Sequence, residues 1–285
     1  VVAGEMRNQP ILIRFSRDED KIYMHQMVSD YVADEDDEIN VSVQRNSIPP
    51  ILNTFPIEAF NNDSTCVFFE VTDYFSNEIP SISPFNNKYK AGKLEKDATF
   101  ILETQAFPQN VEIKTQMSYS NSNRAPFLVV MNRSLLLLPE KPMQPRYEDT
   151  RIGYFSNSIR YFSSKKIGVE SLRFISRFNI QPKPEDVEDY KKGKLVEPEK
   201  QIVFYIDNAF PEEWRSYIKA GIEDWQNAYE EIGFKNAIIA KVYPENDPDF
   251  NPDDIRYSCI RYISMPKANS MGPRWIDPRS GEVIG

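Results

Sequence analysis

The chain has 285 residues, with 40% hydrophobic and 13% aromatic residues, which excludes a disordered protein and predicts sizeable packed cores. Its 43 acidic residues outnumber the 34 basic ones and give a net charge of −9. Such a charge repels phosphate backbones and anionic headgroups, so we expect no nucleic-acid or membrane-surface partner. The longest apolar run, around residues 135–138, is too short to span a bilayer, so we expect no membrane insertion.

Residues 1–180 predict a β-rich domain, with the character of a twisted antiparallel sandwich or an open barrel. Apolar runs at 11–15 and 21–24 flank the charged turn at 18–20 and predict a hairpin. Further strands are predicted at 41–44, 54–60, 65–71, 99–106, 111–119, 127–138 and 171–180. Several of them alternate apolar and polar residues, which predicts one buried and one solvated face.

Proline-rich sequence separates this domain from a different pattern. Residues 140–161 predict a stiff crossing segment, and the charged stretch 181–200 predicts a linker between domains. Residues 201–285 predict an α/β domain. The predicted fold class is therefore α+β, with a sandwich-like domain at 1–180 followed by an α/β domain at 201–285.

The α/β part begins with a continuous apolar strand at 202–206, and further strands are predicted at 237–242 and 255–263. Between the first two lies the clearest helix of the sequence, from Pro211, which suits a first helical position, to Gly233, which suits a helix end. Its apolar residues share one helical stripe: Trp214, Tyr217, Ile218, Gly221, Ile222, Trp225, Ala228, Tyr229 and Ile232. This spacing predicts a core-facing side rather than an aromatic surface for stacking a sugar or cofactor.

Long motifs in both parts resemble a family of large zinc-dependent metalloproteases of bacteria, of metzincin type. In the α/β part they are IVFYIDN, WQNAYEEIGFKNAI, DDIRYSCIRY and NSMGPRWIDPRSGEVI, which begin at residues 202, 225, 253 and 269. Upstream, FPIEAF, LLPEKPMQPR and RIGYF begin at residues 55, 137 and 151, and they resemble the uncharacterised domain that precedes the protease in that family. The order strand, long helix, strand, strand and hairpin is also the order that opens a metzincin catalytic domain.

The resemblance implies a secreted, periplasmic or cell-envelope parent protein that hydrolyses peptide bonds of a polypeptide substrate. Its zinc-bound water would be activated by a glutamate and held by three histidines, two of them in an H-E-x-x-H helix that follows the hairpin. The chain has one histidine, His25, so no catalytic residue or metal ligand can be assigned to it. We therefore expect a chain truncated before the zinc-binding helix, with zinc in the parent only and no activity of its own. The oligomeric state is not indicated.

The candidate substrate-binding segment comprises Met271, Gly272, Pro273, Arg274 and Trp275. In metzincins the edge strand before the active-site helix pairs antiparallel with an extended substrate, whose main chain supplies affinity by strand addition. Pro273 has no N–H to donate, which puts the register of such pairing in question. An ordinary β-hairpin is the alternative, and the sequence does not decide between the two.

Other features have plainer interpretations. His25 is expected to be a surface or hydrogen-bonded histidine, because no partner ligands accompany it. The loop 247–253 has oxygen side chains at every second position, as a calcium loop does, but it lacks the required glycine and late glutamate. A solvated connection is therefore expected there. Cys66 and Cys259 lie in apolar runs, so we expect two buried free thiols, with a disulfide as the alternative.

Two rival functions stay open. The chain is alternatively a non-catalytic protein- or glycan-binding module of the cell envelope, with the α/β part as a structural remnant. A second rival keeps the protease and gives residues 1–180 a prodomain-like role that covers the cleft, for which Cys66 is the only nearby cysteine.

Overall fold

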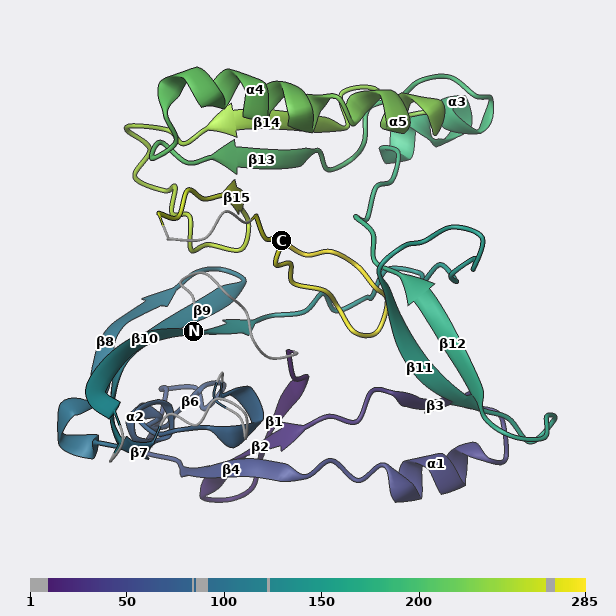
Figure 1. Ribbon diagram of the computed structural model, residues 1–285. Coiled ribbons are helices and arrows are strands. Elements are labelled where there is room, and N and C mark those ends of the chain that lie inside the picture. The colour runs from purple at the N-terminus through teal and green to yellow at the C-terminus, as the bar shows by residue number, and fades with distance from the viewer. Residues whose placement is uncertain (1–9, 84, 86–91, 122–123, 265–269) are drawn as a thin grey trace.

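The computed structural model describes residues 10–83, 85, 92–121, 124–264 and 270–285, and it is a mixed α+β fold. The described residues form five sheets, four of them in the N-terminal part. In Figure 1 the β-rich part lies below, the C-terminal sheet and its helices lie along the top, and the C-terminal hairpin lies between them. No helix in the described part of the chain is long and apolar enough to cross a membrane.

The first sheet confirms the predicted N-terminal hairpin. Strands β1 (Ile13–Arg17) and β2 (Lys21–Gln26) pair antiparallel, and β4 (Ile51–Pro56) pairs with the other side of β2. Alternation along β2 buries Ile22 and Met24 beneath Phe55 of β4. A two-stranded sheet of β5 (Ala59–Phe60) and β6 (Val67–Phe68) follows.

The largest sheet is antiparallel and has the long strand β9 at its centre. It contains β7 (Lys93–Leu94), β8 (Phe100–Ala106), β9 (Asn110–Asn121) and β10 (Arg124–Leu136). Every second side chain of β9 from residue 113 to residue 119 is buried, as the predicted alternation requires. The short helix α2 (Thr72–Phe75) packs Phe75 against Ile113 on that face. Two 3-10 turns, η1 (Pro80–Ile82) and η2 (Lys96–Ala98), flank this sheet.

The fourth N-terminal sheet contains a pairing that the sequence did not indicate. Strand β3 (Tyr31–Ala33) runs parallel to β11 (Ser156–Phe162), which pairs antiparallel with β12 (Glu170–Ile175). The end of the predicted crossing segment, from residue 156, is therefore a strand. Helix α1 (Asn40–Asn46) replaces the strand predicted at 41–44. Val43 is buried and Val41 is exposed, as helical geometry allows, whereas a strand would place both side chains on one face.

The predicted linker is folded and packs against the α/β part. It holds the 3-10 turn η3 (Pro184–Asp186) and α3 (Val187–Lys191). Val196 is buried in one cluster with Phe234 and Ala237. The segment 181–200 therefore shares a hydrophobic core with the α/β unit.

The α/β unit has a parallel sheet of three strands in the order β14–β13–β15. These are β13 (Ile202–Ile206), β14 (Ile238–Val242) and β15 (Ser258–Ile260), the last being shorter than the predicted strand. The predicted single helix is two helices, α4 (Glu212–Glu223) and α5 (Gln226–Glu231), which lie along β13 and β14 in Figure 1. Pro211 precedes the first helical residue as its N-cap.

The prediction that one stripe of this helix is core is wrong for its largest members. Trp214, Tyr217, Trp225 and Ile232 are exposed, and α4 contains no buried residue. Ile218, Ile222 and Tyr229 are half-buried. The sequence pattern combined two neighbouring sides of the helix, only one of which contacts the sheet.

Candidate functional site

The predicted substrate-binding segment has no strand structure over residues 271–274. Met271, Gly272 and Pro273 are exposed, and the Arg274 guanidinium lies 4.2 Å from the centre of the Phe155 ring. Asn269, which the resemblance also included, lies outside the described residues. Pairing begins at Trp275.

Trp275 belongs to a C-terminal hairpin that returns on itself at residues 277–281. The Trp275 amide donates to the Gly285 carbonyl at 2.9 Å, and the Ile284 amide donates to the Trp275 carbonyl at 2.9 Å. Within the described residues, the main-chain groups of Arg274 and Ile276 make no backbone hydrogen bond. Arg274 and Ile276 flank the paired residue Trp275, and neighbouring residues of an extended segment present their main-chain groups to opposite edges. These groups are therefore directed to the edge of the hairpin that has no partner strand among the described residues.

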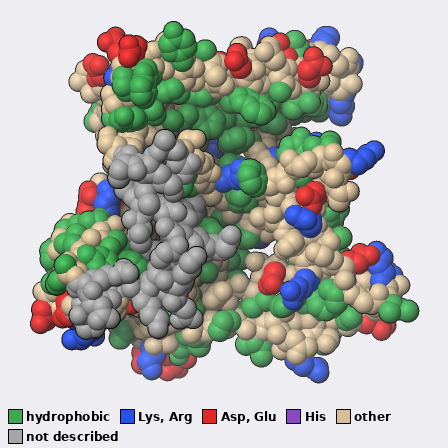
Figure 2. Space-filling view, in the orientation of Figure 1, with side chains coloured by type: hydrophobic (Ala, Val, Ile, Leu, Met, Phe, Trp, Pro, Cys, Tyr) green, Lys and Arg blue, Asp and Glu red, His purple; other side chains and the backbone are tan. Residues whose placement is uncertain are grey.

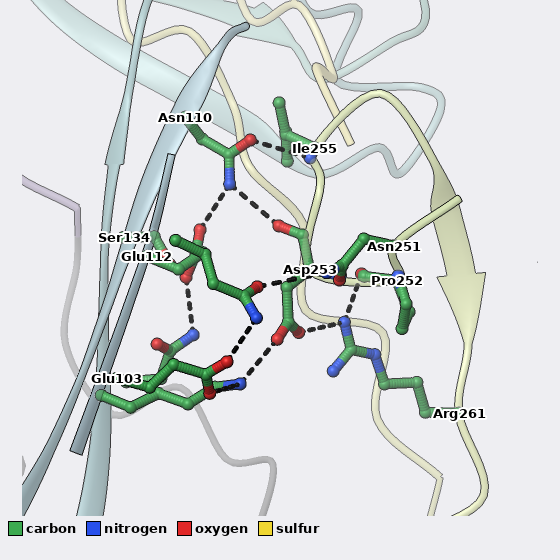
Figure 3. A network of polar contacts seen from close by, with 12 residues as sticks. Glu103, Asn110, Glu112, Ser134, Asn251, Pro252, Asp253, Ile255 and Arg261 are labelled. Carbon is green, nitrogen blue, oxygen red and sulfur yellow. Dashed lines mark hydrogen bonds and ion pairs between the residues drawn. The ribbon is translucent and has the colours of Figure 1, made fainter. Parts of the chain in front are cut away.

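A polar seam joins the β-rich domain to the α/β unit, and sequence analysis did not find it. We define the seam by the strand residues Asn110, Glu112 and Lys114 of β9 and the loop residues Asp253 and Ile255. Figure 3 labels all of them except Lys114. The Asn110 side chain donates to the Asp253 carbonyl at 2.9 Å and accepts from the Ile255 amide at 3.1 Å. The Asn110 amide thus binds one main-chain carbonyl and one main-chain N–H of the loop, as the backbone of a paired strand would.

Charge reinforces the seam. The Asp253 carboxylate binds Lys114 of β9 at 2.8 Å and Arg261 of its own unit at 2.8 Å, and Lys114 also binds Glu103 at 3.1 Å. Burial opposes ionisation of Asp253, but the hydrogen bonds from Lys114 and Arg261 outweigh it and hold the pKa of this carboxyl below its usual value. The seam carboxylate is therefore ionised at neutral pH.

Glu112, a buried strand residue of the seam, has three side-chain donors. Asn110, Asn132 and Ser134 each donate to its carboxylate at 2.6 Å. These bonds replace the water that the carboxylate loses on burial. They also hold the Asn110 amide in the orientation that binds the loop.

The loop predicted as a solvated connection is thus a docking element. Asn251 donates to Gln105 of β8 at 3.2 Å and accepts from the Asp253 amide at 2.8 Å. Because lysine and arginine hold the Asp253 carboxylate, the loop does not offer its oxygens as a calcium loop would. Among the described residues, no group of three or more His, Cys, Asp or Glu side chains could hold a metal ion.

A second contact fixes the C-terminal hairpin against the end of β12. The Arg177 amide donates to the Gly281 carbonyl at 3.0 Å, and the Val283 amide donates to the Arg177 carbonyl at 2.9 Å. The Arg279 guanidinium donates to the Pro139 carbonyl at 2.7 Å while it also binds the fully buried Asp277 carboxylate. Gly281 has a φ of +77°, and a Cβ there would lie 2.5 Å from the Ile175 carbonyl oxygen.

An aspartate followed two residues later by an arginine forms the same local hook at Asp254 and at Asp277. In each case the arginine amide and guanidinium both bind the aspartate carboxylate, with N–O distances between 2.6 and 3.2 Å. Both aspartates are almost completely buried. Each hook fixes a turn whose neighbouring residues contact the β-rich domain.

The remaining candidate residues lie away from the seam. His25 accepts or donates one hydrogen bond with Ser16 at 2.8 Å on the first sheet. Both cysteines are free thiols, but Cys66 is exposed, contrary to prediction, because its apolar neighbours form only the short strand β6. Cys259 is half-buried in β15, and burial raises the pKa of its thiol.

These features define a two-part α+β protein in which a β-rich domain is bonded to an α/β unit by a polar seam and a docked hairpin. The family profile described as "Domain of unknown function (DUF5117)" matches residues 4–183, and the chain belongs to this family. The match ends near the predicted end of the β-rich domain. No curated protein and no solved structure matches the chain.

Proposed function

We propose that this chain is the N-terminal portion of a bacterial zinc-dependent metalloprotease of metzincin type that acts on polypeptides outside the cytoplasm. The observation that carries the proposal is the element order β13, α4–α5, β14, β15 and hairpin, which is the order that the sequence resemblance implies. The described residues do not fit a zinc site. The ligands and the general base are therefore assigned to sequence outside this chain, and no step of the reaction is derived from it.

The contribution of this chain to such a protease is substrate alignment. The free main-chain groups of Arg274 and Ile276 present one acceptor and one donor each on the hairpin edge, which suits an extended peptide added as a further strand. Pro273 adds only an acceptor. Arg274 and Ile276 are thus the residues around which a substrate backbone would pair.

The seam favours a scaffold role for the β-rich domain over a covering role. Asp253 connects this domain to the loop that precedes the candidate edge, and Gly281 connects it to the hairpin that contains this edge. Cys66, the cysteine that a prodomain-like role would use, directly precedes β6. Figure 1 shows β6 in its lower part, whereas the α/β unit lies along the top. Removal of residues 1–180 from the parent should therefore reduce its stability and activity rather than raise its activity.

The test begins with the coding DNA beyond codon 285. An H-E-x-x-H motif with a third nearby histidine supports the proposal, and the longer protein should then contain about one zinc per chain and cleave an unfolded protein such as casein. Its matched control replaces the motif glutamate by glutamine, which should retain zinc and lose cleavage. A reading frame that continues or closes without these histidines refutes the proposal.

A non-catalytic protein-binding module is the second candidate function. The exposed aromatic residues Trp214, Tyr217 and Trp225 favour it, because large aromatic side chains exposed together mark interaction surfaces. Cleavage by the longer protein would decide for the protease. If the longer protein neither contains zinc nor cleaves peptides, the binding module remains as the candidate function.

A further inference from the structure

One side of α4 and α5, next to the half-buried residues that face the sheet, carries an exposed apolar surface. We define the aromatic stripe as Trp214, Tyr217, Trp225 and Ile232, whose side chains are 47%, 79%, 64% and 52% exposed. Their spacing places them along one side of the helical segment. At 1.5 Å per residue the stripe is about 27 Å long, which is the length of a helix of about 18 residues.

Acidic residues border the aromatic stripe. Glu213, Asp224 and Glu231 follow one line beside it, because they are separated by eleven and seven residues, which are close to whole helical turns. None of the three forms an ion pair within the described residues. In Figure 2 the layer along the top, which contains α4 and α5, shows acidic, basic and hydrophobic side chains interspersed.

The nearby basic side chains do not neutralise this border. Arg215 donates to the carbonyls of Phe210 and Asn208 at 3.0 and 2.7 Å, so its guanidinium is directed toward the loop before the helix. Lys219 lies 3.8 Å from Glu223. The border therefore presents uncompensated negative charge beside apolar surface.

Gly221 lies in the middle of the stripe and has no structural reason to be glycine. It is exposed, its φ is not positive, and a Cβ added there meets no atom within 4 Å. Glycine inside a helix is destabilising relative to alanine, because it loses more conformational freedom on folding. A partner whose backbone approaches closely between Tyr217 and Trp225 would account for its presence.

We propose that the aromatic stripe binds a helical polypeptide segment whose apolar face is bordered by lysine or arginine. Length, the central glycine and the charge of the border each fit such a helix. A second copy of this chain does not fit, because antiparallel pairing would set Glu213 against the Glu231 of the other copy. The proposal is independent of the protease assignment, since it involves no zinc or substrate edge.

The test uses two synthetic 18-residue helical peptides and this chain. Both peptides carry leucine and alanine on one face; one has lysine along the border and the other has glutamate. Tryptophan fluorescence and calorimetry should show that the lysine peptide binds at least about tenfold more tightly. Tyr217→Ser and Glu213→Lys should each lower the affinity for the lysine peptide by about tenfold. Ile167→Ser and Glu35→Lys, matched exposed substitutions away from the stripe, should leave binding unchanged.

Gly221 gives an independent measurement. Gly221→Ala should raise the Tm of the free chain. Gly221→Leu should lower the affinity for the lysine peptide by about tenfold while the chain stays folded. Equal affinity for both peptides, or an equal effect of Ile167→Ser and Tyr217→Ser, would overturn the proposal. A concentration-dependent dimer that Tyr217→Ser dissociates would overturn it in favour of a second copy.

Discussion

Gly281 offers the sharpest test of whether the C-terminal hairpin is fixed to the β-rich domain. In Gly281→Ala the new Cβ lies 2.5 Å from the Ile175 carbonyl oxygen and 3.1 Å from the Phe174 ring, so the hairpin must move away from β12. Backbone atoms of a paired strand cannot yield as the end of a flexible side chain does. The expected consequence is loss of docking as well as local strain.

The magnitude follows from two contributions. A non-glycine residue in the left-handed region costs about 1–2 kcal/mol. Loss of the two hydrogen bonds that join Arg177 to Gly281 and Val283, at 3.0 and 2.9 Å, costs about 0.5–1.5 kcal/mol each. Gly281→Ala should therefore lower the free energy of unfolding by about 2–5 kcal/mol.

Gly193→Ala is the matched control, because Gly193 has a φ of +79° and open space where its Cβ would lie. Gly193→Ala should lower the free energy of unfolding only by the cost of the left-handed conformation, about 1–2 kcal/mol. Urea denaturation measures both variants, and amide hydrogen exchange should show faster exchange at Arg177 and Val283 in Gly281→Ala alone. Equal losses in the two variants would refute the docking of the hairpin.

Three further outcomes follow from the seam and the β-rich core. Asp253→Ala should lower the free energy of unfolding, measured by urea denaturation, by about 1–3 kcal/mol, because it removes the carboxylate that binds both Lys114 and Arg261, and high salt should reduce this loss. An unchanged stability would contradict the seam. Arg133 is buried and donates to the Phe75 and Asn77 carbonyls, so Arg133→Met should lower the Tm and cost about 1–3 kcal/mol, and a neutral result would contradict this role. Hydrogen bonds from Ser164 lower the pKa of Asp37 in the folded chain to about 2. The ionised Asp37 carboxylate therefore stabilises the fold fully above the pKa that this group has in the unfolded chain, and this stabilisation is lost as the pH falls through 2. The difference in Tm between the chain and Asp37→Asn should therefore narrow from pH 6 to pH 2, and a constant difference would contradict that assignment.

Local pattern was sufficient where one face of a strand is buried over many residues. The alternation in β9 and the charged turn between β1 and β2 both predicted the observed structure, because side-chain period and turn chemistry are local properties. The four residues from 41 to 44 were too few to distinguish a strand from a turn of helix. Strand β3 was missed because its partner β11 is distant in sequence.

The seam could not be predicted for the same physical reason. Asn110 and Asp253 are ordinary polar residues locally, and only tertiary packing brings their atoms within hydrogen-bond distance. A weak signal existed in the loop 247–253, where oxygen side chains alternate, but this pattern is shared by metal loops and by turns. For α4 the pattern identified the helix but not which side the sheet covers.

The sequence distance across the seam has a consequence for how the chain folds during synthesis. Asp253 joins Lys114 across 139 positions. At a translation rate of 5–20 residues per second, the loop is made roughly 7–28 s after β9. The seam residues of β9 therefore stay exposed to solvent for this interval, although the other strands of their sheet have already been synthesised. Contacts between residues so far apart in sequence stabilise the chain only after the entropic cost of closing a long loop has been met, so seam formation is a late folding event. Conditions that slow translation should lengthen the period in which Asn110 and Lys114 are available to other partners.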